Sequence, residues 1–168
     1  KGFKKAVDMV MDVHIMVDNP DMVSEIFAKA GADIITFHLE AVKDMDACLE
    51  LCRKIRAMGV QAGVSVKPKT AVEGLLAHLK EIDLILIMSV EPGFGGQSFM
   101  EDTLEKVRVL RAQIEKEGLD TRIEIDGGIN KETAKLAVAA GVDTLVAGSY
   151  VFKNGIAEAV DALLACQG

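Results

Sequence analysis

The sequence predicts an α/β fold in which parallel strands alternate with helices, in the manner of a (β/α)8 barrel. Six short apolar runs typical of buried strands alternate with segments of helical pattern. Two junctions repeat almost literally, Ala30-Gly31-Ala32-Asp33 and Ala140-Gly141-Val142-Asp143, where glycine ends a helix and the next residues enter a strand. Alternating units of this length favour a parallel sheet covered by helices.

The boundaries of these elements follow from turn residues and from the hydrophobic pattern. The expected strands are residues 12–17, 33–38, 60–66, 84–89, 122–125 and 143–147. The expected helices are residues 20–30, 44–58, 71–79, 101–117, 131–140 and 156–166, with a helical tail over residues 2–9 and a short helix over residues 149–152.

Polar residues at the strand ends decide between the two architectures that fit this alternation, a doubly wound sheet and a barrel. Six of them stand at or near the carboxyl end of a strand: His14, His38, Lys67, Ser89, Asp126 and Ser149. A doubly wound sheet would gather its site at one switch point. A face shared by every strand–helix loop is the arrangement of a barrel, so we expect a barrel.

Composition narrows the functional class. The 168 residues are 50% hydrophobic with a net charge of −7, which indicates a globular domain and argues against nucleic acid or anionic membranes as partners. An anionic substrate would therefore need local positive potential.

Three cysteines, Cys48, Cys52 and Cys166, form no disulfide framework, so we expect a reducing cytoplasm. The chain starts at Lys1 rather than Met, which suggests a start inside a longer protein.

A glycine-rich stretch follows the strand over residues 84–89. Three glycines, Gly93, Gly95 and Gly96, fall within four residues. Glycine lets successive backbone N–H groups point into one concavity, which favours phosphate binding. The alternative is an ordinary strand–helix turn that needs glycine for its geometry. Two later glycine turns, 127–128 and 148, favour phosphate, because the last two loops of such barrels often form a phosphate site with a short helix.

Two strands place polar residues on their inward face. Period-two alternation puts His14 on the face opposite Val13 and Ile15, and Asp126 at the barrel mouth. We expect Arg122 and Glu124, which share that inward face, to satisfy one another. His14 could be a hydrogen-bonded core histidine and Asp126 a turn-capping residue, but their common rim with three glycine turns favours a functional site.

Five motifs together resemble ribulose-phosphate 3-epimerase over essentially the whole chain. They are Asp12-Val13-His14-Ile15-Met16, Thr36-Phe37-His38-Leu39-Glu40-Ala41, Asp126-Gly127-Gly128-Ile129, Val146-Ala147-Gly148-Ser149 and the highly specific run over residues 88–99. The resemblance implies an isomerase of the pentose phosphate pathway that interconverts D-ribulose 5-phosphate and D-xylulose 5-phosphate. Two carboxylates invert one carbon beside the ketone, and a divalent metal (zinc, iron, manganese or cobalt) acts as Lewis acid.

The resemblance also assigns roles to residues. It implies that Asp126 is an acid/base carboxylate and metal ligand, that His14 is a second metal ligand, and that Met16 and Met88 line the reacting centre. The implied substrate and phosphate cradle is Gly93, Phe94, Gly95, Gly96, Gly127, Gly128, Gly148 and Ser149, with His14 and Asp126 also contacting substrate. His38 lies on the same rim, but the sequence gives it no definite role.

The chain departs from the family pattern at its beginning. The family has two earlier strands, which carry a serine and a His-x-Asp pair that this sequence lacks. We therefore expect residues 1–168 to form one incomplete barrel domain, matching strands three to eight, with little epimerase activity of its own. Unpaired sheet edges would favour self-association. An epimerase acting on allulose 6-phosphate and a non-catalytic phosphate-binding remnant remain the alternatives.

Overall fold

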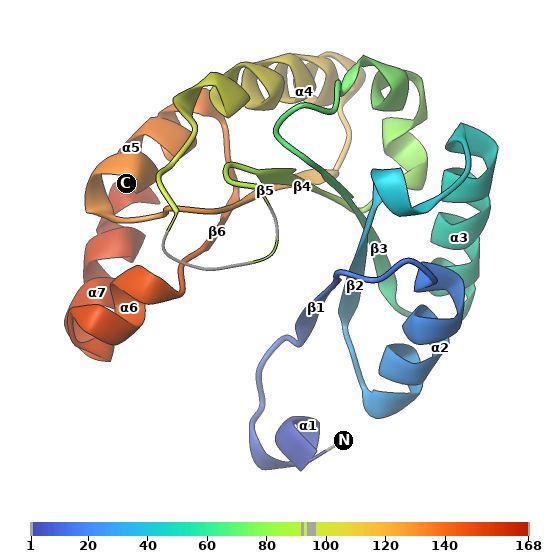
Figure 1. Ribbon diagram of the computed structural model, residues 1–168, viewed down its shortest axis with the longest axis horizontal. Coiled ribbons are helices and arrows are strands. Elements are labelled where there is room, and N and C mark those ends of the chain that lie inside the picture. The colour runs from blue at the N-terminus through green and yellow to red at the C-terminus, as the bar shows by residue number, and fades with distance from the viewer. Residues whose placement is uncertain (1, 92, 94–96, 168) are drawn as a thin grey trace.

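The computed structural model describes residues 2–91, 93 and 97–167. Its centre is a sheet of six parallel strands paired in chain order. The strands are β1 (Asp12–Ile15), β2 (Ile34–His38), β3 (Gln61–Val66), β4 (Leu84–Met88), β5 (Arg122–Asp126) and β6 (Thr144–Val146). The sheet curls into an open arc with helices on its outer side, and β1 and β6 form its two edges (Figure 1). The predicted incomplete (β/α)8 barrel is confirmed.

Helices connect the strands as expected. The α-helices are α1 (Gly2–Ala6), α2 (Pro20–Ala30), α3 (Met45–Ala57), α4 (Leu104–Glu117), α5 (Lys131–Ala140), α6 (Ser149–Lys153) and α7 (Ile156–Leu164). The 3-10 helices are η1 (Leu39–Ala41), η2 (Glu73–Glu81), η3 (Glu101–Thr103) and η4 (Ala165–Gln167). Local chemistry sets their ends: the Asn130 side chain accepts the Thr133 N–H before α5, and Gly141 closes α5 in the left-handed conformation.

Several elements differ from the expectation: the helical tail ends at Ala6, the helix expected over 101–117 begins as the 3-10 helix η3, and η1 was not expected. The segment expected to be an α-helix over 71–79 is the 3-10 helix η2. The buried residues Val72, Leu75, Leu79 and Ile82 are three, four and three positions apart, a spacing that is also typical of an α-helix. Strand β1 ends at Ile15, two residues earlier than expected, so Met16 lies beyond the strand at the rim.

The main core lies between the sheet and the helices. Outward-facing strand residues such as Ile35, Phe37, Ile87 and Ile125 are completely buried there. Burying a side chain of this size contributes about 1.5–3 kcal/mol, so this layer holds the arc together. None of the described helices is both long enough and apolar enough to cross a lipid bilayer.

The inner face of the arc is more polar. Gly63 lies opposite Thr36 in the strand register, and a Cβ on Gly63 would come within 2.2 Å of the Thr36 hydroxyl oxygen. Arg122 donates its hydrogen bond to Gln61 rather than to Glu124, although its positive charge still acts to lower the pKa of Glu124. Glu124 faces Asp12 across the inside of the arc, and burial together with that second carboxylate raises the pKa of Glu124 to about 8.

Candidate functional site

The carboxyl ends of the strands share one rim, and the larger cavity at this rim measures about 560 Å³. Eight of the predicted site residues line it: Met16, Met88, Gly93, Asp126, Gly127, Gly128, Gly148 and Ser149. Strand register brings two of them together, since Met88 pairs with Asp126. Phe94, Gly95 and Gly96, also predicted for the cradle, lie outside the described residues.

Asp126 is the last residue of β5 and its side chain is half-buried. Its backbone carbonyl accepts hydrogen bonds from the Ser89 N–H (2.8 Å) and hydroxyl (3.0 Å), which fix the backbone. Within the described part of the chain, no hydrogen bond or ion pair reaches its carboxylate. Burial raises the pKa of Asp126 above its ordinary value, which moves this group toward the range useful for proton transfer.

The fold requires glycine at both positions of the turn after β5, Gly127 and Gly128. Gly127 has φ of +128°, and a Cβ there would lie 2.6 Å from Cγ2 of Val90. Gly128 has φ of +63°, and its Cβ would lie 2.6 Å from the backbone nitrogen of Phe99. Only glycine fits these positions without strain, because the segment after β4 lies directly against the turn.

The glycine turn after β6 is different. Gly148 has an ordinary φ of −92°, and a Cβ there would meet no described atom within 4 Å. The predicted short helix after it is confirmed as α6, which begins at Ser149. Packing against described residues therefore does not explain Gly148, which lines the larger cavity.

His14 lines neither cavity of the rim directly. It is half-buried, and its Nε2 lies 2.9 Å from Nε2 of His38. Burial and the neighbouring His38 lower the pKa of His14 to about 4, so its imidazole is neutral at pH 7. His38 lines a second cavity of about 240 Å³, and Met16 and Gly93 line both cavities, which therefore adjoin.

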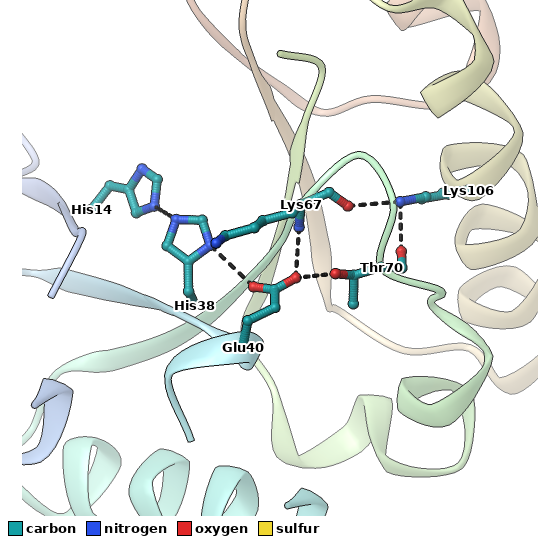
Figure 2. A network of polar contacts seen from close by, with 6 residues as sticks. All are labelled: His14, His38, Glu40, Lys67, Thr70 and Lys106. Atoms are coloured by element: carbon teal, nitrogen blue, oxygen red, sulfur yellow. Dashed lines mark hydrogen bonds and ion pairs between the residues drawn. The ribbon is translucent and has the colours of Figure 1, made fainter. Parts of the chain in front are cut away.

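Sequence reasoning missed the contacts that surround His38. Figure 2 shows His14, His38 and Glu40 in a row, with Glu40 held by Lys67 and Thr70. The sequence held one signal for this arrangement: Glu40 follows His38 by two residues inside a family motif. Lys153, which lines the larger cavity from α6, was also missed. It places a positive charge at the cavity of this acidic chain.

The donors His14 and Asp126 suit a divalent metal in kind, because imidazole and carboxylate bind zinc, iron, manganese and cobalt. They do not suffice in number. Among residues 2–91, 93 and 97–167, no three His, Cys, Asp or Glu side chains are grouped so that they could hold a metal ion. A tight site needs three or four protein ligands, so the described residues do not complete a metal centre.

Comparison with known proteins gives consistent results. The chain matches the sequence model of the Ribulose-phosphate 3 epimerase family over residues 1–152. It is 49% identical over 145 residues to ribulose-phosphate 3-epimerase of Mycobacterium tuberculosis (strain ATCC 25618 / H37Rv), covering 86% of this chain and 62% of the relative. It is 42% identical over 153 residues to the Bacillus subtilis (strain 168) protein of that name, covering 90% and 69%.

Two solved structures share the fold at lower identity. One is 3-hexulose-6-phosphate synthase from Salmonella typhimurium, with a TM-score of 0.72 and 20% identity, covering 98% of this chain and 75% of that one. The other is 3-keto-L-gulonate-6-phosphate decarboxylase from Vibrio cholerae, with a TM-score of 0.72 and 19% identity, covering 95% and 72%. At this identity the likeness shows the fold alone.

Proposed function

Because the chain belongs to the ribulose-phosphate 3-epimerase family, we propose that it carries one acid/base carboxylate and the phosphate cradle of an enzyme that interconverts D-ribulose 5-phosphate and D-xylulose 5-phosphate. One observation carries the proposal. The carboxylate of Asp126, for which the described residues provide no partner, and the open turn at Gly148 line the same cavity. A proton-transfer group and a space for an anion are what inversion of a sugar phosphate requires.

Asp126 has the acid/base role in this proposal. The C3–H bond lies beside a ketone, so a carboxylate can remove or return its proton. Met88 is 2% exposed and lines the cavity next to Asp126, so it helps to exclude water and to raise the pKa of that carboxylate. Lys153 and the turn at 148–149 would bind the phosphate at the opposite end of the substrate.

The remaining parts of the proposal concern groups outside this sequence. We assign β1–β6 to strands three to eight of the family barrel. The chain spans about 62% of the length of its Mycobacterium tuberculosis relative, and it contains no His-x-Asp pair. A divalent metal bound by His14 and Asp126 would therefore need further ligands from outside the described residues.

A hybrid protein tests the proposal. The segment of the Mycobacterium tuberculosis relative that precedes the match is joined to this chain and produced in a host lacking its own epimerase. We expect metal-dependent conversion of D-ribulose 5-phosphate, reduced about 10³-fold by Asp126→Asn, and little conversion by the 168-residue chain alone.

Two results would overturn this assignment. The first is a hybrid whose turnover does not change on substitution of Asp126. The second is a hybrid that prefers allulose 6-phosphate, which would place the chain with an epimerase of hexulose phosphates. Phosphate binding without any turnover would instead support the non-catalytic alternative.

Self-association and a cytoplasmic location complete the proposal. The edges of the sheet at β1 and β6 support self-association, as do the exposed Ile156, Val160 and Leu164 on one face of α7. Sedimentation velocity at several concentrations measures self-association.

The free thiols of Cys48, Cys52 and Cys166 fit a reducing compartment.

A further inference from the structure

We propose that the second cavity of the rim is a subsite for the hydroxyl-bearing end of a sugar phosphate, with Lys67 as its hydrogen-bond donor and Asp18 as its acceptor. This inference rests on the proposed function, because it takes the phosphate group to occupy the larger cavity. It assigns residues to the end of the substrate that lies away from the phosphate.

The second cavity measures about 240 Å³ and is lined by residues that follow β1, β2 and β3. It adjoins the larger cavity, since Met16 and Gly93 line both. Lys153 and Gly148 line the larger cavity from the segment after β6. The two cavities therefore follow the rim from β6 to β2. We place the phosphate at the β6 end and the opposite end of the ligand in the second cavity.

Lys67 follows β3, and its backbone is held on both sides. Its N–H donates to Oε1 of Glu40 at 2.9 Å. Its carbonyl oxygen accepts hydrogen bonds from the Thr70 N–H (3.0 Å) and from the Lys106 ammonium group (2.8 Å). Its own ammonium group forms no hydrogen bond or ion pair within the described part of the chain. A fixed backbone with an unpaired cation leaves one strong donor for a ligand.

The neighbouring carboxylate of Glu40 does not take up this charge. Its two oxygens contact the Lys67 N–H, the Thr70 hydroxyl and, at 3.3 Å, Nδ1 of His38. Figure 2 shows the side chain of Lys67 extending toward His38, which also lines the second cavity. Glu40 therefore fixes the backbone of Lys67 and leaves its ammonium group available at the cavity.

Asp18 supplies the complementary group. It lies beyond the end of β1, is exposed and lines the second cavity. Among the residues that the structure describes, none forms a hydrogen bond or ion pair with its carboxylate. An ammonium group donates and a carboxylate accepts, and each hydroxyl of a sugar can do both. The two unpaired groups of this cavity therefore suit a hydroxyl-bearing ligand.

The charges of the second cavity also disfavour a phosphate there. Asp18 and Glu40 place two carboxylates beside one ammonium group, and like charges repel a phosphate dianion at short distance. At the β6 end of the larger cavity, Lys153 lies with the uncharged Gly148 and Asn154 instead. The phosphate is therefore favoured at the β6 end, which leaves the second cavity to the hydroxyls.

Two phosphates of different length test the subsite by calorimetry. D-ribulose 5-phosphate has a hydroxyl-bearing end, whereas glycolaldehyde phosphate has no hydroxyl and is shorter. We expect Lys67→Met and Asp18→Ala each to weaken binding of D-ribulose 5-phosphate about 10-fold, because each removes a charged hydrogen-bond partner. Binding of glycolaldehyde phosphate should not change.

Matched variants control for charge and for the phosphate end. Lys69→Met, on the same loop, and Asp46→Ala, on α3, change exposed residues that line neither cavity, so both should bind D-ribulose 5-phosphate like the unchanged chain. Gly148→Ala should weaken both ligands. If Lys67→Met also weakened both ligands equally, Lys67 would bind the phosphate and the assignment would be wrong. Unchanged affinity for D-ribulose 5-phosphate in Lys67→Met and Asp18→Ala would overturn it as well.

Unphosphorylated D-ribulose separates this proposal from the proposed function. In ¹H–¹⁵N spectra of the 168-residue chain, millimolar D-ribulose should shift the backbone amide signals of Asp18 and Lys67 and leave that of Gly148 unchanged. The shift at Asp18 should disappear in Lys67→Met. These shifts without binding of either phosphate would support the subsite and count against the phosphate cradle of the proposed function. If D-ribulose shifted neither signal, the subsite would be wrong whatever the phosphates do.

Discussion

The two halves of the rim differ in how their polar groups are satisfied. At the ends of β1–β3, the side chains of His14, His38 and Glu40 bind one another and the loop after β3. At the ends of β4–β6, Asp126 presents a carboxylate for which the described residues supply no partner. Polar groups that are already paired hold a fixed geometry, whereas unpaired groups are available to a ligand. The first half therefore holds a fixed arrangement, whereas the carboxylate in the second half has no partner among the described residues.

The same contrast recurs inside the second half, between its two glycine turns. A Cβ at Gly127 would collide with Val90, whereas a Cβ at Gly148 would meet nothing described within 4 Å. Two turns that look alike in the sequence thus have different reasons for glycine. The first serves the fold and the second leaves space at the cavity.

Substitution of Gly127 should have the largest effect on stability. Gly127→Ala places a Cβ in the left-handed region at φ of +128° and 2.6 Å from Val90. We expect a loss of roughly 3 kcal/mol in the free energy of unfolding, from strain and overpacking together. Urea denaturation measures it. A loss below about 1 kcal/mol would show that the turn and the segment after β4 can separate easily.

Removing the ammonium group of Lys106 should have the next largest effect. Lys106→Met keeps the alkyl stem but removes the ammonium donor shared by three backbone carbonyls of the loop after β3, of which that of Lys67 keeps the Thr70 N–H. We expect a loss of about 2 kcal/mol on urea denaturation. Faster hydrogen exchange should accompany it at the Lys67 N–H, which binds Glu40. Lys116→Met, on the exposed surface of α4, is the control. It should change the free energy of unfolding and the exchange rate of the Lys67 N–H only a little.

Substitution of Gly148 should separate binding from folding. Gly148→Ala has room for its Cβ and an ordinary φ, so the free energy of unfolding should change by less than about 0.5 kcal/mol. The methyl group would nevertheless project beside the cavity that Gly148 lines. We expect about 10-fold weaker binding of D-ribulose 5-phosphate by calorimetry, equal to about 1.4 kcal/mol. Unchanged affinity would remove this turn from the binding surface.

The smallest expected effect is a gain in stability. Burial raises the pKa of Asp126, which means that its charged form is less favourable in the folded chain than in the unfolded chain. Asp126→Asn removes this unfavourable charge, so it should raise the free energy of unfolding at pH 7 by less than about 1 kcal/mol. Thermal unfolding at pH 7 measures the change. A clear loss of stability would mean that the carboxylate has a structural partner.

Local rules explain why so much of the fold could be predicted. Glycines such as Gly31 and Gly141 end helices through their own backbone conformation, and apolar runs such as 84–88 mark buried strands. The prediction of an α-helix at η2 was wrong, because the spacing of apolar residues alone does not distinguish an α-helix from a 3-10 helix.

The hydrogen-bond network that joins His14, His38, Glu40, Lys67, Thr70 and Lys106 could not be predicted, because its members come from separate elements that meet only on packing. Glu40 meets Lys67 and Thr70 only when the loop after β3 folds over the rim. Lys106 reaches that loop from α4, 36 to 39 residues further along the chain. Period-two alternation identified His14 as inward-facing, but alternation within one strand cannot say which residue of the next strand faces it.

Met16 lies just beyond β1, is 52% exposed and lines both cavities of the rim. Its side chain is unbranched, with three rotatable bonds and a soft thioether, so it changes rotamer at little energetic cost. A single rotation of this side chain can enlarge one cavity while it narrows the other. The space at the rim therefore depends on the conformation of Met16 as well as on the fixed walls.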